Sequence, residues 1–485
     1  MSLALAPKST DQVDTEPASL SYATEDLLGQ AIFGQAELGD QRRTKRLVQL
    51  FRRLRHHPGG TLPAKLSSPA ELRAFYRLCD CDQVTHEAMI ACVRQHTLAR
   101  VAAHEGAVLI LHDATELDYT TLTSLCDDLG QIGTGTGRGY ICQNVLAVSA
   151  ETGAVLGLVD QILHHRDEVP EHETLPEHRD RASRESLLWL RGTQHLPAET
   201  KLIDVGDQGS DTFEFLEHEY RSGRRFVIRA CKTRKAYAGH AAKGQLQPLQ
   251  PLADSLPELG RFIMDVQAQP GRKARQDAEF VLRGGPVLVC PPHAKHGHHG
   301  DDPLPLYVVR VVEVNPPAGQ AAIEWTLLTN EPVQTFDDAW RVTGWYERRW
   351  IVEEFHKAQK TGCQIEDLQF TTIARLEPAI ALLSIVATTL LNLRDASRRQ
   401  DAKLRPALEV VAVEYVEVLS MMRQGKICLE WTVHDFFYAL ARLGGHQNRK
   451  SDGQPGWLVL WRGWVKLQSL LDGYTAAKLN KCGKR

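Results

Sequence analysis

The chain has no run of about 20 consecutive apolar residues, the length that a helix needs to cross a bilayer. The most apolar stretch, residues 379–393, is shorter and contains Ser384, Thr388 and Asn392, so it predicts a buried helix. The N-terminal sequence MSLALAPKSTDQVDTEP includes acidic residues and has no apolar core, which argues against a signal peptide. We therefore expect a cytoplasmic protein without a membrane partner.

Paired cysteines are also missing. The ten cysteines are scattered, none forms a Cys-x-x-Cys motif, and the closest two are Cys79 and Cys81. This spacing predicts neither a zinc framework nor a set of disulfides. We expect reduced, partly buried thiols.

The net charge is small, −3 for 485 residues, and by itself indicates no nucleic-acid partner. The average conceals two basic blocks, however. Residues 41–57 contain seven Lys or Arg and no acid, and residues 221–235 contain seven more. Because apolar residues interrupt the cations, such blocks are expected to dock a folded surface on phosphates. The candidate DNA-binding residues are Arg42, Arg43, Arg46, Arg229, Lys232 and Arg234.

The first 20 or so residues are rich in Ser, Thr, Pro and acid, which predicts disorder. Helical periodicity follows from about residue 25 to residue 100. Within it, Ser68-Pro69-Ala70-Glu71 is typical of a helix start, with a Ser cap, Pro at the first position and an acid in the first turn. We predict a helical DNA-binding domain over residues 1–86.

Short apolar runs then replace the helical pattern. AVLILHD, NVLAVSA, AVLGLVDQ and KLIDVGD begin at residues 107, 144, 154 and 201, and their length and β-branched content predict buried strands of a central sheet. RFVIRA, PVLVC, LYVVRVVEV and IEWTLLT predict a β insertion at about residues 220–330. The fold class is therefore α/β, with a catalytic domain over residues 87–398 and a C-terminal helical domain over residues 399–485.

Candidate chemistry begins with Asp113 and Asp207, each at the end of a predicted strand, because open α/β sheets place their sites at this edge. A lone Asp there is more often a turn or cap residue. Together with Glu353, however, the two aspartates supply the hard oxygen ligands that Mg²⁺ and Mn²⁺ prefer.

Glu353 lies in WYERRWIVEEFHKAQKTG, residues 345–362, which we predict to be one helix. Tyr346, Glu353 and Lys360 are seven residues apart and so align to within about 20° around the helix axis, with Arg349 one turn before Glu353. A carboxylate flanked by cations suits phosphoryl transfer on a polyanion. Spacing alone also allows a solvated face, with pairs from Glu353 to Arg349 and Lys357 that contribute only about 0.2–0.5 kcal/mol each.

The pattern Y-x-x-R-W-x-V-E-E-F-H-K-A-x-K-T-G, residues 346–362, closely resembles the Tyr-Arg-Glu-Lys signature of DDE transposases of the insertion-sequence-four family. LGD at residue 38, RFVIR at 225, TLLTNEPV at 326, ALARLGG at 439 and W-x-x-L-x-S-x-LDG-x-x-AAK at 464 resemble the same family in the same order. The resemblance covers nearly the whole chain.

This resemblance implies a ribonuclease-H-like catalytic core, in which Asp113, Asp207 and Glu353 are the catalytic ligands of two Mg²⁺ ions and Mn²⁺ substitutes. Tyr346, Arg349 and Lys360 would then hold transposon-end phosphates. Trp325 would pack in a pocket that receives a flipped base, although an ordinary sheet aromatic is the alternative.

The resemblance also implies a cut-and-paste reaction. The enzyme would bind inverted repeats in double-stranded DNA, cleave them by metal-dependent hydrolysis and hairpin formation, and join the 3′-hydroxyls to target DNA. A homodimer would carry out this reaction, and the protein would be bacterial and associated with the nucleoid. Whether Trp457, Trp461 and Trp464 belong to a dimer interface or to the core stays open.

Two segments depart from the family pattern. Gln208-Gly209 replaces the usual Arg-Glu after Asp207, and residues 139–142 lack the usual aromatic pair, so the DNA contacts of the family are not carried over to these positions. Two rival functions also remain. A binding-only protein would need a broken acidic triad, and a glycosidase would explain paired acids but not the basic blocks.

Overall fold

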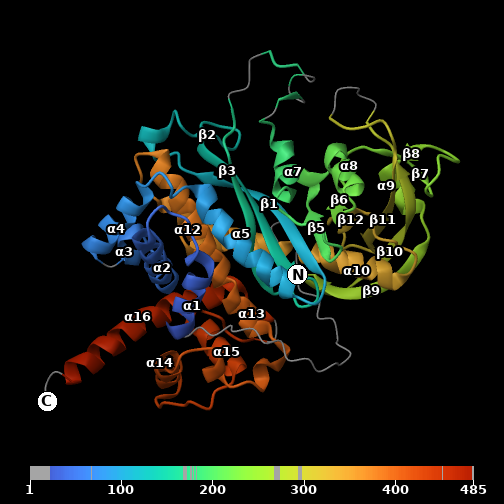
Figure 1. Ribbon diagram of the computed structural model, residues 1–485. Helices are drawn as coiled ribbons and strands as arrows, with labels where there is room; N and C mark the ends of the chain where they lie inside the picture. Colours follow the sequence, from blue (N-terminus) through green and yellow to red (C-terminus); the bar gives the residue numbers. More distant parts are fainter. Residues whose placement is uncertain are drawn as a thin grey trace.

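The computed structural model describes residues 22–66, 68–167, 172–174, 177, 180–181, 183–266, 274–292, 298–449 and 452–482. The disorder predicted for the first 20 residues lies outside these ranges. The protein is mixed α/β, with one large sheet between groups of helices (Figure 1). The predicted α/β class and helical N-terminal region are confirmed.

The N-terminal helices begin where the sequence provides caps. Asp40 accepts the N–H of Arg42 at 2.7 Å, and Ser68 accepts the N–H of Glu71 at 3.1 Å, with Pro69 at the first position of the helix. The apolar face of the second helix is buried, so several of its cations face outward. The helices are α1 (Tyr22–Phe33), α2 (Gln41–His56), α3 (Leu62–Leu66), α4 (Pro69–Cys79) and α5 (His86–Ala103).

The central sheet has 12 strands in the order β2-β3-β1-β5-β6-β12-β11-β10-β7-β8, with β4 paired to β3 and β9 paired to β10. β3 is antiparallel to both β1 and β4, whereas β5 and β6 continue in parallel from β1. The strands are β1 (Val108–Asp118), β2 (Gly130–Gln131), β3 (Arg138–Ser149), β4 (Val155–His164), β5 (Leu202–Gly206), β6 (Arg225–Arg229), β7 (Lys235–Ala238), β8 (Gln247–Pro248), β9 (Glu258–Val266), β10 (Arg275–Val289), β11 (Leu304–Glu313) and β12 (Glu324–Thr329).

All eight predicted apolar runs contribute to strands of this sheet, but the expected place of RFVIR needs correction. This segment is β6, which pairs in parallel with β5 and antiparallel with β12. It therefore belongs with the strands that precede it, and β12, β11 and β10 extend the same sheet outward from β6. Backbone hydrogen bonding is thus continuous from the first half of the sheet to the second.

Further helices pack around the sheet. α11 contacts β1, α12 contacts α5 and β4, and α8 contacts β6. The helices after β4 are α7 (Leu188–Thr193), α8 (Phe213–Arg221), α9 (Leu249–Ser255), α10 (Phe336–Glu347), α11 (Trp350–Lys357), α12 (Ile373–Leu390), α13 (Asn392–Arg398), α14 (Val413–Gln424), α15 (Val433–Leu443) and α16 (Trp457–Cys482).

Residues Ile373–Arg398 are long and apolar enough to cross a membrane by length and composition alone. In the structure, 89% of their most apolar window is buried inside the protein. The predicted buried helix is therefore confirmed. Nine cysteines in the described part of the chain are free thiols.

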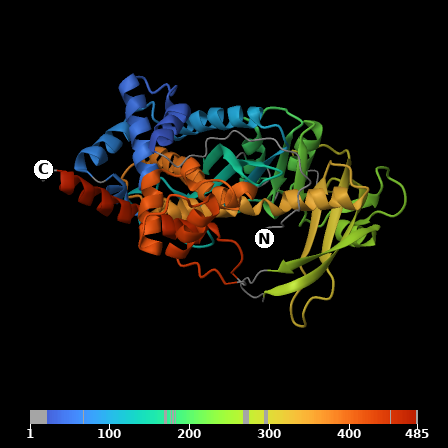
Figure 2. The same cartoon turned by 90° about the horizontal axis from the view of Figure 1, so that it is seen from below.

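One hydrophobic core joins the N-terminal helices, one face of the sheet, α10 to α12 and the C-terminal helices. Trp457, Trp461 and Trp464 are only 2–4% exposed and belong to this core, so the open question about them is answered in favour of packing. The far end of α16 projects away from the body of the protein (Figure 2). The three domain boundaries stay a prediction.

Candidate active site

Asp113 lies inside β1 and not at its end, so the predicted position is wrong in this detail. β1 continues to Asp118 because β3 pairs along its whole length. β5, in contrast, ends at Gly206, opposite His112. Asp113 and Asp207 therefore occupy equivalent positions on parallel neighbours, at the point where β1 loses its β5 partner.

The two aspartates also share a face of the sheet. Leu109 and Leu111 on β1, and Ile203 and Val205 on β5, lie in the core that contains α10 to α12. Because side chains alternate along extended backbone, Asp113 and Asp207 point to this same face. The neighbouring buried residues on the other face include His112, whose Nε2 lies 2.7 Å from Asp204 Oδ1.

The segment that carries Glu353 is not one helix, and that prediction is wrong. α10 ends at Glu347, α11 begins at Trp350, and a π-helical turn follows at Ala358–Gly362. Between α10 and α11 the backbone bonds tighten to a three-residue spacing, with Arg349 N–H donating to Tyr346 O at 3.0 Å. The stripe predicted from Tyr346 to Lys360 is thus assembled from separate pieces.

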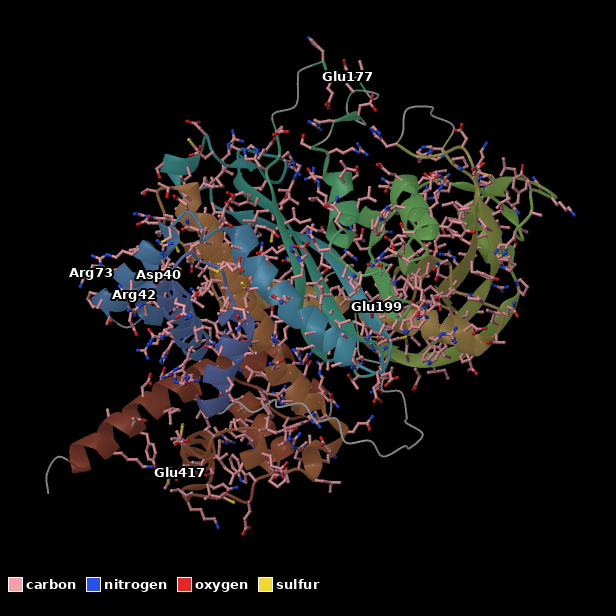
Figure 3. All side chains as sticks on the ribbon, viewed as in Figure 1. Asp40, Arg42, Arg73, Glu177, Glu199 and Glu417 are labelled. Atoms are coloured by element: carbon pink, nitrogen blue, oxygen red, sulfur yellow. The ribbon has the colours of Figure 1, made fainter. Side chains whose placement is uncertain are left out.

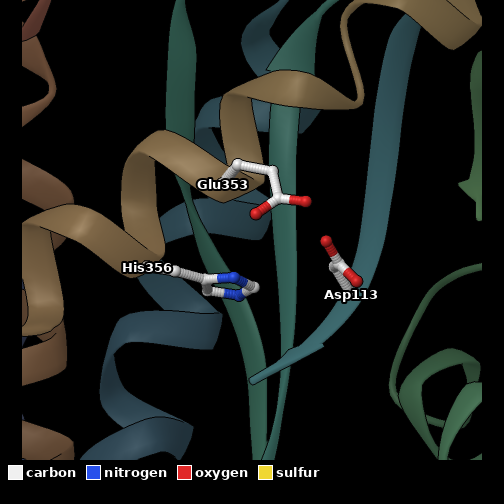
Figure 4. Close-up of side chains that lie close together, drawn as sticks. All are labelled: Asp113, Glu353 and His356. Carbon is white, nitrogen blue, oxygen red and sulfur yellow. The ribbon is translucent and has the colours of Figure 1, made fainter. Parts of the chain in front are cut away.

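Asp113, Glu353 and His356 converge at this site. One ligand atom from each of the three lies within 4.8 Å of the others, and the side chains point toward one another (Figure 4). Glu353 and His356 are three residues apart on α11, so they share one face of that helix. The group could hold a metal ion. Our sequence analysis missed His356, although its spacing from Glu353 was a usable signal.

Arg349 lies across the two acids. Its Nη1 donates to Asp113 Oδ2 at 2.7 Å, and its Nη2 is 3.5 Å from Glu353 Oε1. Lys360 Nζ is 3.1 Å from Glu366 Oε1. Lys357 lies over the Trp350 ring, 5.7 Å from its centroid, and the structure records this contact where an ion pair with Glu353 was expected. Arg349 and Lys360 are therefore both engaged by carboxylates in this conformation.

Burial dominates the electrostatics of the site. It raises the pKa of Asp113 to about 7, Arg349 opposes the shift, and the charges of Asp207 and Glu353 reinforce it. Burial also lowers the pKa of His356 to about 3, assisted by Lys360 and Arg349. At neutral pH the site therefore contains a neutral imidazole. It also contains carboxyl groups that disfavour each other's negative charge.

This donor set fits a divalent cation. His356 is 7% exposed, and its Nε2 has no hydrogen-bond partner within the described part of the chain. Such a buried, unpaired nitrogen is costly unless a ligand satisfies it. A cation would do so, and it would also relieve the repulsion from Asp207 and Glu353, which adds to the effect of burial on the pKa of Asp113.

Asp207 is placed somewhat apart. Its carboxylate accepts the N–H of Gly209 at 2.8 Å and caps the short turn that follows β5. It is not part of the close group formed by Asp113, Glu353 and His356. Its charge nevertheless contributes to the pKa shifts of Asp113, Tyr346 and Arg349, so it faces the same site.

Tyr346 and Trp325 are in contact at the edge of the site. Tyr346 is 5% exposed, and its ring lies edge-on to Trp325 with the centroids 5.3 Å apart. Trp325 also lines an apolar cavity of about 10 Å³, roughly the space of one water molecule. The base-receiving role expected of Trp325 stays a prediction. Arg229 reaches the carbonyl of Glu324 at 3.4 Å and contributes to the pKa of Tyr346.

The basic residues separate into exposed and engaged groups. Arg42 and Arg46 on α2 are exposed, and Figure 3 labels Arg42 on the N-terminal helices, together with the exposed Arg73 of α4. Arg43, in contrast, donates to Gln83 Oε1 at 2.7 Å and to the carbonyl of residue 38. Arg42 and Arg46 are thus exposed to solvent, and their contact with DNA stays a prediction.

The second basic block is used mainly inside the protein. Lys232 is exposed, but Arg234 is 6% exposed and is held by Asp211, with Nη2 to Oδ1 at 2.6 Å. Arg224 and Arg225 pair with Asp204 and Glu331. The expectation that Arg234 contacts DNA is corrected, because its guanidinium is already committed to a buried carboxylate.

A buried polar network lies behind the site and was also missed. Asn144 on β3 is opposite Asp113, and its Oδ1 accepts from Gln161 Nε2 at 2.8 Å. Ser384 Oγ on α12 accepts from Gln161 at 3.0 Å and from Gln359 in the π-helical turn at 2.9 Å. The network ties that turn to the sheet. Its only sequence signal was a polar Asn144 at the start of an apolar run.

Residues 29–84 match the family model described as Transposase DNA-binding. The match covers α2 to α4, which carry the exposed arginines, and includes the end of α1. It supports a DNA-binding transposase, with DNA as its partner. The predicted helical DNA-binding region is thus confirmed at this level.

Proposed function

We propose that this chain is a DDE transposase of the insertion-sequence-four family. It cuts double-stranded DNA at transposon ends and joins the freed 3′-hydroxyls to target DNA. The observation that carries the proposal is the convergence of Asp113 from β1 and Glu353 from α11, in a chain with a transposase-type DNA-binding region. Residues about 240 positions apart in the sequence meet at one site.

The sheet topology supports a ribonuclease-H-like core. Five neighbouring strands run in the order β4-β3-β1-β5-β6, with β3 antiparallel to its neighbours and β5 and β6 parallel to β1. Asp113 lies on the central strand of these five and Asp207 directly follows the next one. A metal-dependent phosphoryl-transfer site at this position suits the proposed fold.

Asp113, Asp207 and Glu353 would hold two Mg²⁺ ions, for which Mn²⁺ substitutes. When bound, such ions activate water or a 3′-hydroxyl and stabilise the leaving oxygen. Arg349 and Lys360 would then exchange their carboxylate partners for DNA phosphates, with Tyr346 beside them. Trp325 would stabilise an extruded base in the hairpin, which requires its small cavity to open.

Dimerisation on DNA is part of the proposal, with each subunit cutting the end bound by the other. The three tryptophans of α16 are buried in the core, so they are poor candidates for this contact. The later part of α16 carries the exposed residues Asp472, Thr475 and Lys478 and projects from the body (Figure 1). We assign the dimer contact to this part of α16. The proposed enzyme would act at the bacterial nucleoid.

The test is cleavage of the inverted repeats that flank the coding gene, with Mg²⁺ and Mn²⁺ compared. Asp113→Asn, Asp207→Asn and Glu353→Gln should each lower nicking by at least about 100-fold while end binding in a gel shift stays within about twofold. The exposed control, Asp301→Asn, should behave as wild type.

Three results would contradict the proposal. Near-normal nicking by one variant would remove that residue from the catalytic set. End binding without any wild-type cleavage would favour a binding-only protein, and hydrolysis of polysaccharide without DNA would favour a glycosidase.

A further inference from the structure

We propose that His356 is a direct nitrogen ligand for a metal ion at this site, and that it biases the site toward Mn²⁺ and related transition ions over Mg²⁺. The inference relies on the proposed function for the role of the ion. It goes beyond that function because a site with a histidine nitrogen selects among metal ions differently from a site made of three carboxylates alone.

The position of His356 is the first argument. It lies one helical turn after Glu353, and the two side chains and Asp113 bring one ligand atom each to within 4.8 Å of the others. Figure 4 shows the ring between α11 and β1, directed at both carboxylates. His356 is therefore already in the place that a third ligand would occupy.

Burial without a partner is the second argument. His356 is 7% exposed, and in the described part of the chain its Nε2 finds no hydrogen-bond donor or acceptor. His104, His164 and His446 also have an unpaired Nε2 in the described part of the chain, and among these four only His356 is grouped there with two carboxylates. A buried ring beside Asp113 and Glu353, with one unpaired nitrogen, offers a donor to an ion that these two carboxylates hold.

Ion preference follows from the donor atoms. Mg²⁺ and Ca²⁺ favour oxygen ligands, whereas imidazole nitrogen suits first-row transition ions, whose affinity for a given site rises from Mn²⁺ onward. Asp113, Glu353 and His356 form a mixed oxygen and nitrogen set. Asp207 lies outside it, so an ion held mainly by Asp207 gains no nitrogen ligand from His356. The two metal positions of the proposed enzyme are thus chemically different.

The experiment uses the full chain without DNA. Titration calorimetry with MnCl₂ and MgCl₂ compares wild type with His356→Phe, which keeps a buried ring, and with His356→Asn. We expect Mn²⁺ affinity to fall at least about tenfold in both variants and Mg²⁺ affinity to change less than about twofold. His434→Phe, a half-buried histidine outside the site, should leave both affinities unchanged. Thermal melting confirms that the variants fold.

Pulsed electron paramagnetic resonance of the Mn²⁺-loaded chain provides the direct readout. Wild type should show coupling to a coordinated ¹⁴N nucleus, and His356→Phe should lose it. Absence of nitrogen coupling in wild type, or equal loss of Mn²⁺ and Mg²⁺ affinity in the variants, would overturn the inference.

Failure of this inference differs from failure of the proposed function. If wild-type Mn²⁺ binding shows no nitrogen coupling but Asp113→Asn and Glu353→Gln abolish cleavage, the transposase proposal stands alone. If the coupling is present but wild type cleaves no DNA, the metal site stands and the transposase proposal fails.

Discussion

Arg349 and Asp113 form an ion pair in the candidate active site, with Nη1 2.7 Å from Oδ2, and the same guanidinium lies 3.5 Å from Glu353. A positive charge thus already occupies the space between the two acids. Because a metal ion would be drawn to the same carboxylates, Arg349 and the ion compete for them. Release of Arg349 toward DNA would then accompany metal binding.

Replacing Arg349 should therefore strengthen metal binding in the absence of DNA. Arg349→Gln removes the competing charge and leaves the carboxylates to the ion, so we expect Mg²⁺ affinity to rise about tenfold, or roughly 1.4 kcal/mol. Calorimetry on the isolated chain measures it. Lys357→Gln, a neighbouring cation that lies over Trp350, is the matched control and should change nothing. Unchanged or weaker affinity in Arg349→Gln would show that no competition exists.

The metal-free protein should lose stability as the pH rises from about 4 to about 7. The pKa of Asp113 is about 7 in the folded chain and near 3.8 when unfolded, so the folded state keeps a proton that the unfolded state has lost. Below pH 4 both states are protonated, and above pH 7 both are charged. Asp113→Asn should thus melt a few degrees above wild type at pH 8, and the difference should vanish near pH 4.

Melting in the presence of a chelator measures this dependence. Asp301→Asn, at an exposed site, should follow the wild-type curve. Equal melting of Asp113→Asn and wild type at every pH would contradict the buried, proton-retaining Asp113.

The exposed arginines of α2 should account for part of the salt dependence of DNA binding. Each phosphate contact that is lost reduces the slope of log K against log salt by about one, so Arg42→Ala with Arg46→Ala should reduce it by about two. Fluorescence anisotropy at several salt concentrations gives the slope. Lys426→Ala, exposed in the C-terminal region, is the control. An unchanged slope would move the DNA surface away from α2.

Arg234→Ala should destabilise the fold and leave the salt slope intact. The change leaves Asp211, which is fully buried, without its guanidinium partner. Removing one partner of such a pair costs about 3–5 kcal/mol of folding free energy. The backbone N–H groups of Cys231 and Lys232 still donate to Asp211 and would reduce this cost. Chemical denaturation measures the loss. A stable Arg234→Ala with weakened DNA binding would restore the original expectation for this residue.

Gln359→Leu should weaken metal binding through its effect on the π-helical turn. The substitution keeps the volume of the side chain but removes its bonds to Ser384 and Asn144, at a cost of about 1–3 kcal/mol. Because Glu353 and His356 directly precede the turn, we expect lower Mn²⁺ affinity as well as lower stability. Gln364→Leu, after the turn, should affect only stability. Normal metal affinity in Gln359→Leu would leave the network a purely structural role.

The strands were predictable because each is a short apolar run between polar boundaries. Asp113 was misplaced because β1 continues through residues 114–118, which are only partly buried once β5 has ended. Beyond Asp113 the sequence is therefore no longer continuously apolar. Backbone pairing with β3 nevertheless keeps these residues in the strand. Asp113 and Asp207 could be proposed as site residues because a charge after an apolar run stands out in sequence.

The site was predictable in its acids and not in its cations. Arg349 looked like a phosphate contact since its partner Asp113 is 236 residues away, and Arg234 looked exposed because Asp211 lies 23 residues before it. Nor does helical spacing reveal the interruption between α10 and α11, because both sides of the break keep the same periodic pattern. Such pairings depend on tertiary packing, which one-dimensional patterns do not contain.

The π-helical turn at Ala358–Gly362 places the side chains that follow α11 correctly only if its number of residues is unchanged. It buries Gln359 completely while Lys360 remains partly exposed. Deleting one residue here would rotate the following side chains by about 100° relative to α11. Gln359 would lose its place against Ser384, and the charge of Lys360 would move into the buried position that Gln359 now fills. Across related sequences, single-residue insertions and deletions should therefore be rarer in this stretch than substitutions.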